Sequence, residues 1–349
     1  MRFKQNSPHL SVTDEGESCE AFLPRAPGAD STTSPAEAEP RIKIGFIVGP
    51  TGIGKTALAL EVAQRLGAEI VNADSRQLYR GMDIGTAKPS AAELARVRHH
   101  LVDVRWPGEP LDVAQFRALA GAAIADAAGR GRPVLVTGGS GLYLRVLRYG
   151  IFTGPGASPP IRQELLAAAR RHGVEHLYDE LRRIDPAAAR RLEPRDLYRI
   201  VRAIEVFRVT GVTMSRHQAA HGFARPEYLS LTIGLRMERE RLYGAIDRRF
   251  DAMMAAGLVD EVKALLERGY TPHAPPLSTI GYKHIASYLR GEGTLEAAVA
   301  LAKRDTRRLA KRQMTWFRRD PEIVWIDADG GAEQAYRLLA DFFNSPADT

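Results

Sequence analysis

The chain has one cysteine, Cys19, and lacks any long apolar run. A single cysteine excludes both an internal disulfide framework and a cysteine-based zinc site. No uninterrupted apolar stretch approaches the roughly 18 residues that a membrane-spanning helix needs, and none near the N-terminus resembles the apolar core of a secretory signal. We therefore expect a cytoplasmic protein with no membrane partner.

The first 40 residues also have few large apolar side chains and are rich in Ser, Pro, Glu and Ala. They cannot bury enough surface to offset the entropy of ordering, so we predict a disordered tail over residues 1–40. They carry three basic and seven acidic side chains, a net charge of −4, whereas the whole chain carries +7. The remainder therefore carries +11. This excess suits a polyanion such as nucleic acid, although an ordinary basic surface would also show it.

A glycine-rich loop follows the first apolar run, residues 42–48. Its form, G-x-x-x-x-G-K-[ST], is that of a phosphate-binding loop, and its residues are Gly49, Pro50, Thr51, Gly52, Ile53, Gly54, Lys55 and Thr56. Glycines let successive backbone N–H groups point at phosphate oxygens, and the helix that follows adds its positive N-terminal dipole. Lys55 would reach the terminal phosphate, and the Thr56 hydroxyl would hold Mg²⁺. The loop thus indicates a di- or triphosphate ligand.

Apolar runs alternate with helical patterns through the first part of the chain. We predict strands at 42–48, 69–73, 100–104 and 133–137, and helices at 56–66 and 113–128. This alternation predicts an α/β fold, a P-loop NTPase-like parallel sheet with helices on both faces. Ligands of such sheets bind beyond the carboxyl ends of the strands, where Gly49, Asp74 and Gly138 should converge.

A second unit interrupts this core. Residues 150–160 are rich in Pro and Gly and read as a linker. Apolar residues then recur at helical spacing over 161–171, 174–185 and 196–209, before a strand at 229–235 and helices at 238–267, 280–289 and 295–318. We therefore divide the chain into a tail (1–40), the first part of the catalytic core (41–155), a helical insertion domain (156–228) and the completion of the core (229–349).

The strand at 133–137 ends in Thr-Gly-Gly rather than in an acidic residue that could hold Mg²⁺. Residues 102–103 are a weaker candidate for that acidic motif, so a strict nucleotide hydrolase is disfavoured and a transferase remains. Asp74 closes the second strand beside the phosphate loop, where it could accept the proton of an attacking nucleophile. Considered alone, it would more often cap the following turn.

Two other classes of protein would share some of these features. A small-molecule kinase would also have a P-loop, an acid after the second strand and a helical lid, but it does not explain the basic C-terminal helix. A nucleotide-sensing RNA-binding protein without chemistry is the other alternative. Stabilisation by ATP with Mg²⁺ would identify the kinase, and binding of RNA without any turnover would identify the binding protein.

Several further motifs follow one another along the chain. They are Asp74-Ser75-Arg76-Gln77-Leu78-Tyr79, residues 81–89 (GMDIGTAKP), residues 138–145 (GGSGLYLR), residues 280–283 (IGYK) and residues 306–317 (TRRLAKRQMTWF). In this order they resemble the signatures of tRNA dimethylallyltransferases. With the phosphate loop, the resemblance runs from about residue 42 to residue 326.

The resemblance implies transfer of a dimethylallyl group from dimethylallyl diphosphate to N6 of adenosine 37, beside the anticodon of a tRNA. The phosphate loop would then hold the donor diphosphate with Mg²⁺, with Asp74 as the base and Lys55 and Ser140 as further catalytic residues. The tRNA-binding residues implied are Asp74, Ser75, Arg76, Gln77, Ser140, Arg162, Tyr198, Arg199 and Arg202. We expect a monomer whose macromolecular partner is the anticodon stem-loop.

The chain departs from the family pattern at three places. Ser140 stands where the family has Thr, and keeps the hydroxyl. Tyr198 stands where the family has Gln, ahead of two retained arginines, Arg199 and Arg202. Ser278 replaces an Arg or Gln found in some members.

Basic residues gather on two predicted helices. Arg195, Arg199 and Arg202 recur at i, i+4 and i+7 and should share one helix face that meets phosphate, with Ile200, Ile204 and Phe207 packed on another. A merely solvated basic face has the same spacing. Residues 303–319 contain eight basic residues and one acid, with Trp316 and Phe317 available for packing or for stacking on a base.

Overall fold

The computed structural model describes residues 41–152, 154–222, 226–272 and 274–346, so the expectation for residues 1–40 lies outside the described residues. Its centre is a six-stranded sheet in the order β3-β2-β4-β1-β5-β6, in which every pair is parallel. The strands are β1 (Lys43–Val48), β2 (Glu69–Asn72), β3 (His99–His100), β4 (Val134–Gly138), β5 (Leu229–Arg236) and β6 (Ile323–Asp327). The predicted parallel α/β sheet is confirmed.

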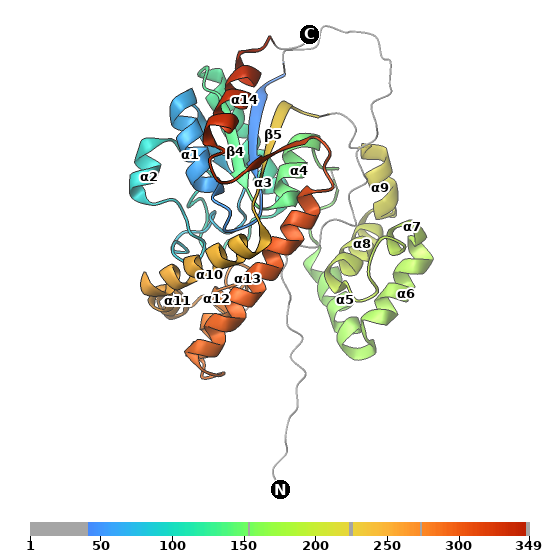
Figure 1. Ribbon diagram of the computed structural model, residues 1–349. Coiled ribbons are helices and arrows are strands. Elements are labelled where there is room, and N and C mark those ends of the chain that lie inside the picture. The colour runs from blue at the N-terminus through green and yellow to red at the C-terminus, as the bar shows by residue number, and fades with distance from the viewer. Residues whose placement is uncertain (1–40, 153, 223–225, 273, 347–349) are drawn as a thin grey trace, which may run out of the picture.

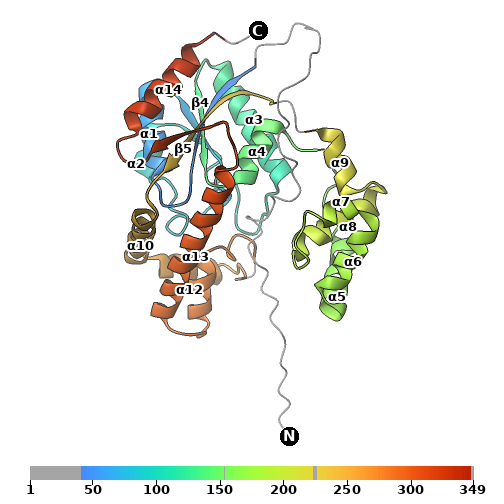
Figure 2. The ribbon, with the colours of Figure 1, turned by 45° about the vertical axis from the view of Figure 1, so that its right-hand side comes forward.

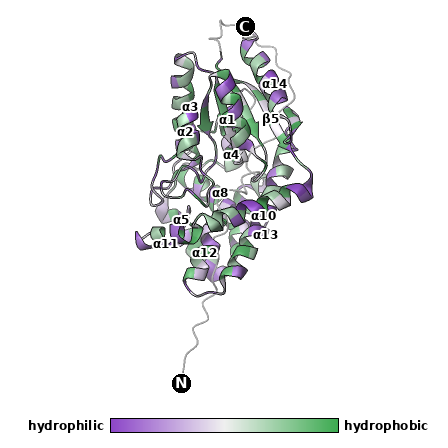
Figure 3. Cartoon of the chain, turned by 60° about the vertical axis from the view of Figure 1, so that its left-hand side comes forward, coloured by the Kyte–Doolittle hydropathy of each residue, from purple (hydrophilic) through white to green (hydrophobic). Residues whose placement is uncertain are grey.

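Helices cover both faces of the sheet (Figure 1). They are α1 (Lys55–Leu66), α2 (Ala91–Arg96), α3 (Val113–Gly129), α4 (Gly141–Tyr149) and α14 (Ala332–Asn344). One apolar cluster joins α1 and α14 to the sheet, and a second joins α3 and α4 to it. Figure 3 shows the apolar strands enclosed between these helices.

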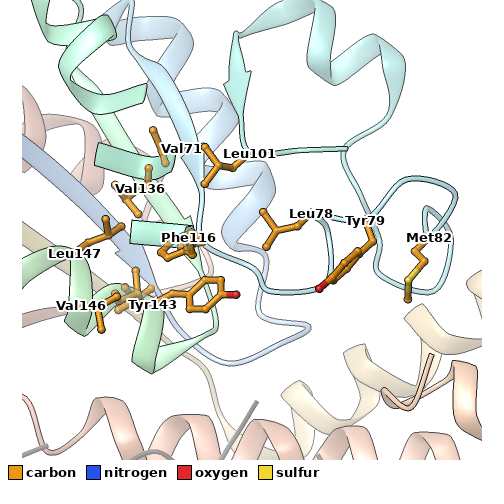
Figure 4. Close-up of a cluster of buried hydrophobic side chains, with 14 of the residues drawn as sticks. Val71, Leu78, Tyr79, Met82, Leu101, Phe116, Val136, Tyr143, Val146 and Leu147 are labelled. Carbon is orange, nitrogen blue, oxygen red and sulfur yellow. The ribbon is translucent and has the colours of Figure 1, made fainter. Parts of the chain in front are cut away.

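The second cluster anchors the end of β4 that leads into the site. Phe116 of α3 and Tyr143 of α4 stack with ring centroids 3.7 Å apart and an interplanar angle of 16°. Figure 4 shows these rings beside Val136 of β4, with Leu78 and Tyr79 further along the same cluster. Burial of this size and closeness fixes the turn after β4 against the sheet.

Five helices stand between α4 and β5 in the chain. They are α5 (Pro159–His172), α6 (Val174–Ile184), α7 (Pro186–Ala189), α8 (Leu197–Thr210) and α9 (Met214–His221). Their buried apolar side chains form a cluster of their own, distinct from the two beside the sheet. In Figures 1 and 2 they lie to one side of the sheet.

A last group of helices covers the carboxyl edge of the sheet. It comprises α10 (Arg239–Ala255), α11 (Leu258–Glu267), α12 (Tyr282–Leu289) and α13 (Leu295–Phe317). The approach is close, because a Cβ on Gly52 would lie 2.7 Å from Cγ1 of Ile246 on α10. No helix in the described ranges is both long and apolar enough to cross a bilayer.

Some sequence expectations for single elements were wrong. The third strand is only His99–His100, because Leu101 and Asp103 adopt left-handed φ values of 61° and 56° that end it. The single helix expected over 238–267 is two, α10 and α11, because Gly257 has φ 97° between them. The helix α4, the strand β6 and the helix α14 were not predicted.

Candidate active site

Three strand ends meet at one edge of the sheet, as the sequence predicted. A Cβ built on Gly138 would lie 2.3 Å from the carbonyl oxygen of Ala73, and one on Gly139 would lie 3.8 Å from that of Gly49. Beyond this edge lies a cavity of about 530 Å³. Its lining includes Thr51, Gly52, Asp74, Ser75, Arg76, Gly139, Ser140, Ile246, Arg249, Phe250, Met253, Leu309, Gln313 and Trp316.

The phosphate loop has the backbone that its sequence requires. Gly52 and Gly54 adopt φ values of 82° and 99°, a region that only glycine enters without strain. Gly54 is also the N-cap residue of α1. Because glycine has no side chain to cap the helix, the first backbone N–H groups of α1 can bind a ligand. The loop is therefore built to receive an anion.

Lys55 folds back over this loop, and its Nζ donates a hydrogen bond to the carbonyl oxygen of Pro50 at 2.9 Å. Burial of the ammonium lowers the pKa of Lys55 to about 8, the nearby Asp74 carboxylate acts in the opposite direction, and Arg249 lowers the pKa further. An anion bound in the loop would restore the charged form.

Asp74 caps the turn that follows β2. Its Oδ1 accepts the backbone N–H of Arg76 at 2.9 Å, and its own N–H donates to Oδ1 of Asn72 at 3.1 Å. The capping interpretation is therefore confirmed, but it does not compete with a chemical role. The cap fixes the carboxylate while the residue still lines the cavity.

Ser140 links the turn after β4 to the turn after β2. Its Oγ lies 3.4 Å from the backbone N–H donor of Ser75 and 3.4 Å from Oγ of Ser75. Ser140 is the N-cap residue of α4 yet makes no side-chain cap hydrogen bond, so its hydroxyl serves this cross-link instead. The change from Thr to Ser keeps the contact.

Arg249 is a site residue that sequence reasoning missed. On α10, Ile246, Arg249, Phe250 and Met253 recur at helical spacing and all line the cavity. Burial lowers the pKa of Arg249 while the charge of Asp74 raises it, and both residues line the same cavity. The sequence shows the helical spacing, but it offers two adjacent arginines, Arg248 and Arg249. Only the packing of α10 shows that Arg249 is the one that lines the cavity.

Gln77 supports the wall of the cavity. It is buried, and its Nε2 donates to the carbonyl oxygens of Thr86 at 3.2 Å and Ala87 at 3.1 Å. Glu261 holds the other end of this segment by accepting the N–H groups of Asp83, Ile84 and Gly85 and the hydroxyl of Tyr282. The contact of Gln77 with the target base stays a prediction.

The predicted basic face of α8 is wrong in one respect. The side chain of Arg199 is only 9% exposed and pairs with Asp196 at 3.1 Å, so this guanidinium is not presented to solvent. Helical spacing placed it correctly on the helix, but the N-cap Asp196 draws it inward. Arg195 precedes the helix and is exposed.

The buried carboxylate of Glu205 pairs with two arginines of this region, Arg162 and Arg202. Glu205 accepts hydrogen bonds from the backbone N–H of Ser158 at 2.7 Å, from Arg202 at 2.7 Å and from Arg162 at 3.0 Å. Burial raises the pKa of Glu205, but these bonds outweigh it and hold the pKa below its usual range. The Arg162 guanidinium also lies 6.0 Å from the ring centroid of Tyr198. Arg162, Tyr198 and Arg202 are thus brought together.

The aromatic pair near the C-terminus divides between two roles. Trp316 lines the cavity beside Gly141, where a Cβ would lie 2.5 Å from its Cδ2, whereas Phe317 is almost fully buried and belongs to the apolar core where that core borders the cavity. Ser278 donates through Oγ to the carbonyl oxygen of Pro275 at 2.8 Å and so caps its own turn.

Known proteins share this sequence and fold. The family model described as IPP transferase matches residues 77–320. The chain belongs to the IPP transferase family. A relative named tRNA dimethylallyltransferase, from Geobacter metallireducens, is 48% identical over 306 residues, which cover 88% of this chain and 99% of the relative. Another, named tRNA dimethylallyltransferase 2, from Geotalea uraniireducens, is 50% identical over 307 residues with the same shares covered.

Solved structures agree with this membership. A tRNA isopentenylpyrophosphate transferase from Bacillus halodurans has a TM-score of 0.64 and 39% identity, covering 86% of this chain and 96% of its own. A eukaryotic dimethylallyltransferase captured acting on tRNA has a TM-score of 0.75 and 26% identity, covering 88% of this chain and 81% of its own. The P-loop core and the adjoining helices therefore have counterparts in family members of known structure.

The pKa of Lys55 generates a test of the phosphate loop. Because bound diphosphate favours the ammonium form, affinity for a monoalkyl diphosphate, whose last ionisation is complete below about pH 8, should fall about tenfold between about pH 8 and about pH 9.5. Lys55→Met should bind more weakly and lose most of this dependence. Titration calorimetry measures both proteins, and equal pH slopes would contradict the assignment.

Arg248 and Arg249 offer a matched pair of variants on α10. Arg249→Ala should weaken binding of inorganic diphosphate by about 10- to 100-fold, the effect of losing one charge-assisted contact. Arg248→Ala removes the same side chain from outside the cavity and should change affinity by less than about threefold. If the two variants bind alike, Arg249 does not face the anion.

Proposed function

We propose that this chain transfers a dimethylallyl group from dimethylallyl diphosphate to N6 of adenosine 37 in tRNA. The observation that carries this proposal is the position of Asp74, in one cavity with the phosphate loop and flanked by Lys55 and Arg249. A carboxylate beside an anion site fits a base for an attacking amine. The names of the relatives support the substrate pair.

The leaving diphosphate is where most of the charge develops. The carbon–oxygen bond of an allylic diphosphate breaks toward a cation that the double bond stabilises, so binding of the released diphosphate controls much of the barrier. The loop N–H groups, Lys55 and Arg249 are preorganised for that charge, and losing one such donor costs on the order of 10²–10³ in rate. Apolar Phe250, Met253 and Trp316 on the same cavity suit the five-carbon group.

The nitrogen of adenine bonds to the allylic carbon as the diphosphate departs, and Asp74 accepts the proton that the amino group loses. The base must leave its stack to enter the cavity, which costs a few kcal/mol and least in a loop such as that of an anticodon. We assign Ser75, Arg76 and Ser140, which line the cavity beside Asp74, to the approach of this base.

Magnesium would fit this site only together with the diphosphate. The described residues contain no group of three His, Cys, Asp or Glu side chains that could hold a metal ion. Mg²⁺ commonly keeps one or two protein ligands and takes the rest from phosphate and water, and the Thr56 hydroxyl at the start of α1 would supply one. The ion would supply further neutralisation of the leaving group.

Helices α5 to α9 would form the tRNA-contacting insertion, residues 156–228, within a core made by 41–155 and 229–349. The group of Arg162, Tyr198 and Arg202 gives this insertion a cationic and aromatic surface suited to RNA. We further propose that the chain acts as a monomer in the cytoplasm.

Asp74→Asn tests the reaction. The amide keeps an oxygen for the Arg76 N–H but cannot take a proton, so kcat should fall by about 10²- to 10⁴-fold while the donor KM changes by less than about threefold. The assay is unmodified tRNA with radiolabelled dimethylallyl diphosphate, followed by nucleoside analysis. Turnover within about threefold of wild type would show that Asp74 is not the general base. Phosphate transfer from ATP, with no alkylated adenosine, would favour the kinase alternative.

Tyr198 and Val209 allow a matched test of the insertion. Both belong to α8 and both are 45% exposed, but only Tyr198 adjoins Arg162. Tyr198→Ala should raise the KM for tRNA by about 5- to 100-fold, the range for losing one stacked base, and leave the donor KM alone. Val209→Ala should change neither. Equal effects of the two variants on tRNA would exclude this surface from the interface.

A further inference from the structure

Gln313 of α13 bridges the two glycine-rich loops of the site. Its Oε1 accepts the backbone N–H of Thr51 at 2.8 Å, and its Nε2 donates to the carbonyl oxygen of Gly139 at 3.0 Å. Thr51 belongs to the phosphate loop, and Gly139 precedes Ser140. One amide therefore connects three segments that are far apart in the chain.

The space at Gly139 is shaped around this amide. A Cβ on Gly139 would lie 2.6 Å from Nε2 of Gln313, closer than any real contact of that kind. The backbone of Gly139 does not have the left-handed φ that would itself require glycine. The glycine is thus explained by room for the Gln313 side chain.

Two roles would account for such a contact. The amide oxygen could stand in for a phosphate oxygen and leave when the donor binds, or the amide could remain as a fixed link. If the Gln313 amide left, both of its hydrogen bonds would be lost. A phosphate oxygen in its place could not donate a hydrogen bond to the carbonyl oxygen of Gly139. The loop N–H groups after Thr51, together with Lys55 and Arg249, remain available to the diphosphate. The contacts favour the fixed link.

We propose that Gln313 is a positioning residue that fixes the spacing between the donor loop and the turn at Gly139 and Ser140. Because Ser140 also contacts the turn of Asp74, this spacing determines where the reacting carbon lies relative to the base. The inference rests on the proposed function. A misplacement of about 1 Å between reacting groups can cost about 10²-fold in rate. The consequence should appear in kcat more than in binding.

Gln313→Met keeps the length of the side chain and removes both hydrogen bonds. It should lower kcat by about 10- to 100-fold, with the KM values for donor and tRNA within about threefold. Gly139→Ala should displace the amide and produce the same change. In the double variant the losses should not multiply, because both substitutions break the same link. Leu301→Ala, on an exposed position of α13 away from the cavity, is the control and should behave as wild type.

Gln313→Glu separates the two contacts. The carboxylate can still accept from Thr51 but cannot donate to Gly139, and its charge lies beside the bound diphosphate. It should lower kcat as Gln313→Met does and also raise the donor KM. A purely structural role would instead lower the melting temperature without this difference between the two variants.

Hydrogen exchange at the Thr51 amide provides a readout that needs no turnover. In Gln313→Met and in Gly139→Ala this amide should lose protection, while other loop amides change less. An unchanged Thr51 amide, a kcat within about threefold of wild type, or donor binding tightened by about tenfold would each overturn the proposal. If wild type transfers no prenyl group yet the Thr51 amide loses protection in the variants, the proposed function fails and the link stands.

Discussion

Parallel pairing of β2, β4 and β1 is the constraint on which the site depends. Because these neighbouring strands run in one direction, their carboxyl ends lie side by side, and the chain leaves each of them as a tight turn. One turn is the phosphate loop, one is capped by Asp74, and one carries Ser140. Close packing admits no side chain at Gly138, so the turns are held at backbone contact. Three segments with no sequence proximity therefore share one small volume.

Positive charge exceeds negative charge within that volume, which therefore favours an anionic ligand. Two partly buried cations, Lys55 and Arg249, lie near the Asp74 carboxylate. Desolvation disfavours the charged form of each cation, and an incoming diphosphate relieves that cost. In the proposed reaction this arrangement would also stabilise the departing diphosphate, so binding of the donor and the chemistry would use the same groups.

The sequence predicted the parts of the site that are local. The phosphate loop is contiguous, and the position of Asp74 follows from the end of one strand, so pattern alone was sufficient. Arg249 and Gln313 could not be found in this way, because their roles depend on how α10 and α13 pack over the sheet edge. Arg199 shows the converse, since its spacing on the helix was right but the nearby Asp196 determined its burial. The third strand was shortened by left-handed backbone that no periodicity reveals.

The helices α10 and α13 are also joined by charge along their length. Asp247 pairs with Arg307 at 2.6 Å, and Asp251, one turn further on, pairs with Lys303, also at 2.6 Å. Two ion pairs one turn apart oppose sliding of one helix along the other, even though each ion pair alone contributes little. The helix that carries Arg249, α10, and the helix that carries Gln313, α13, are thereby linked to each other. Because these two ion pairs join α10 and α13, we expect Arg249 and Gln313 to keep their separation when this wall of the cavity moves.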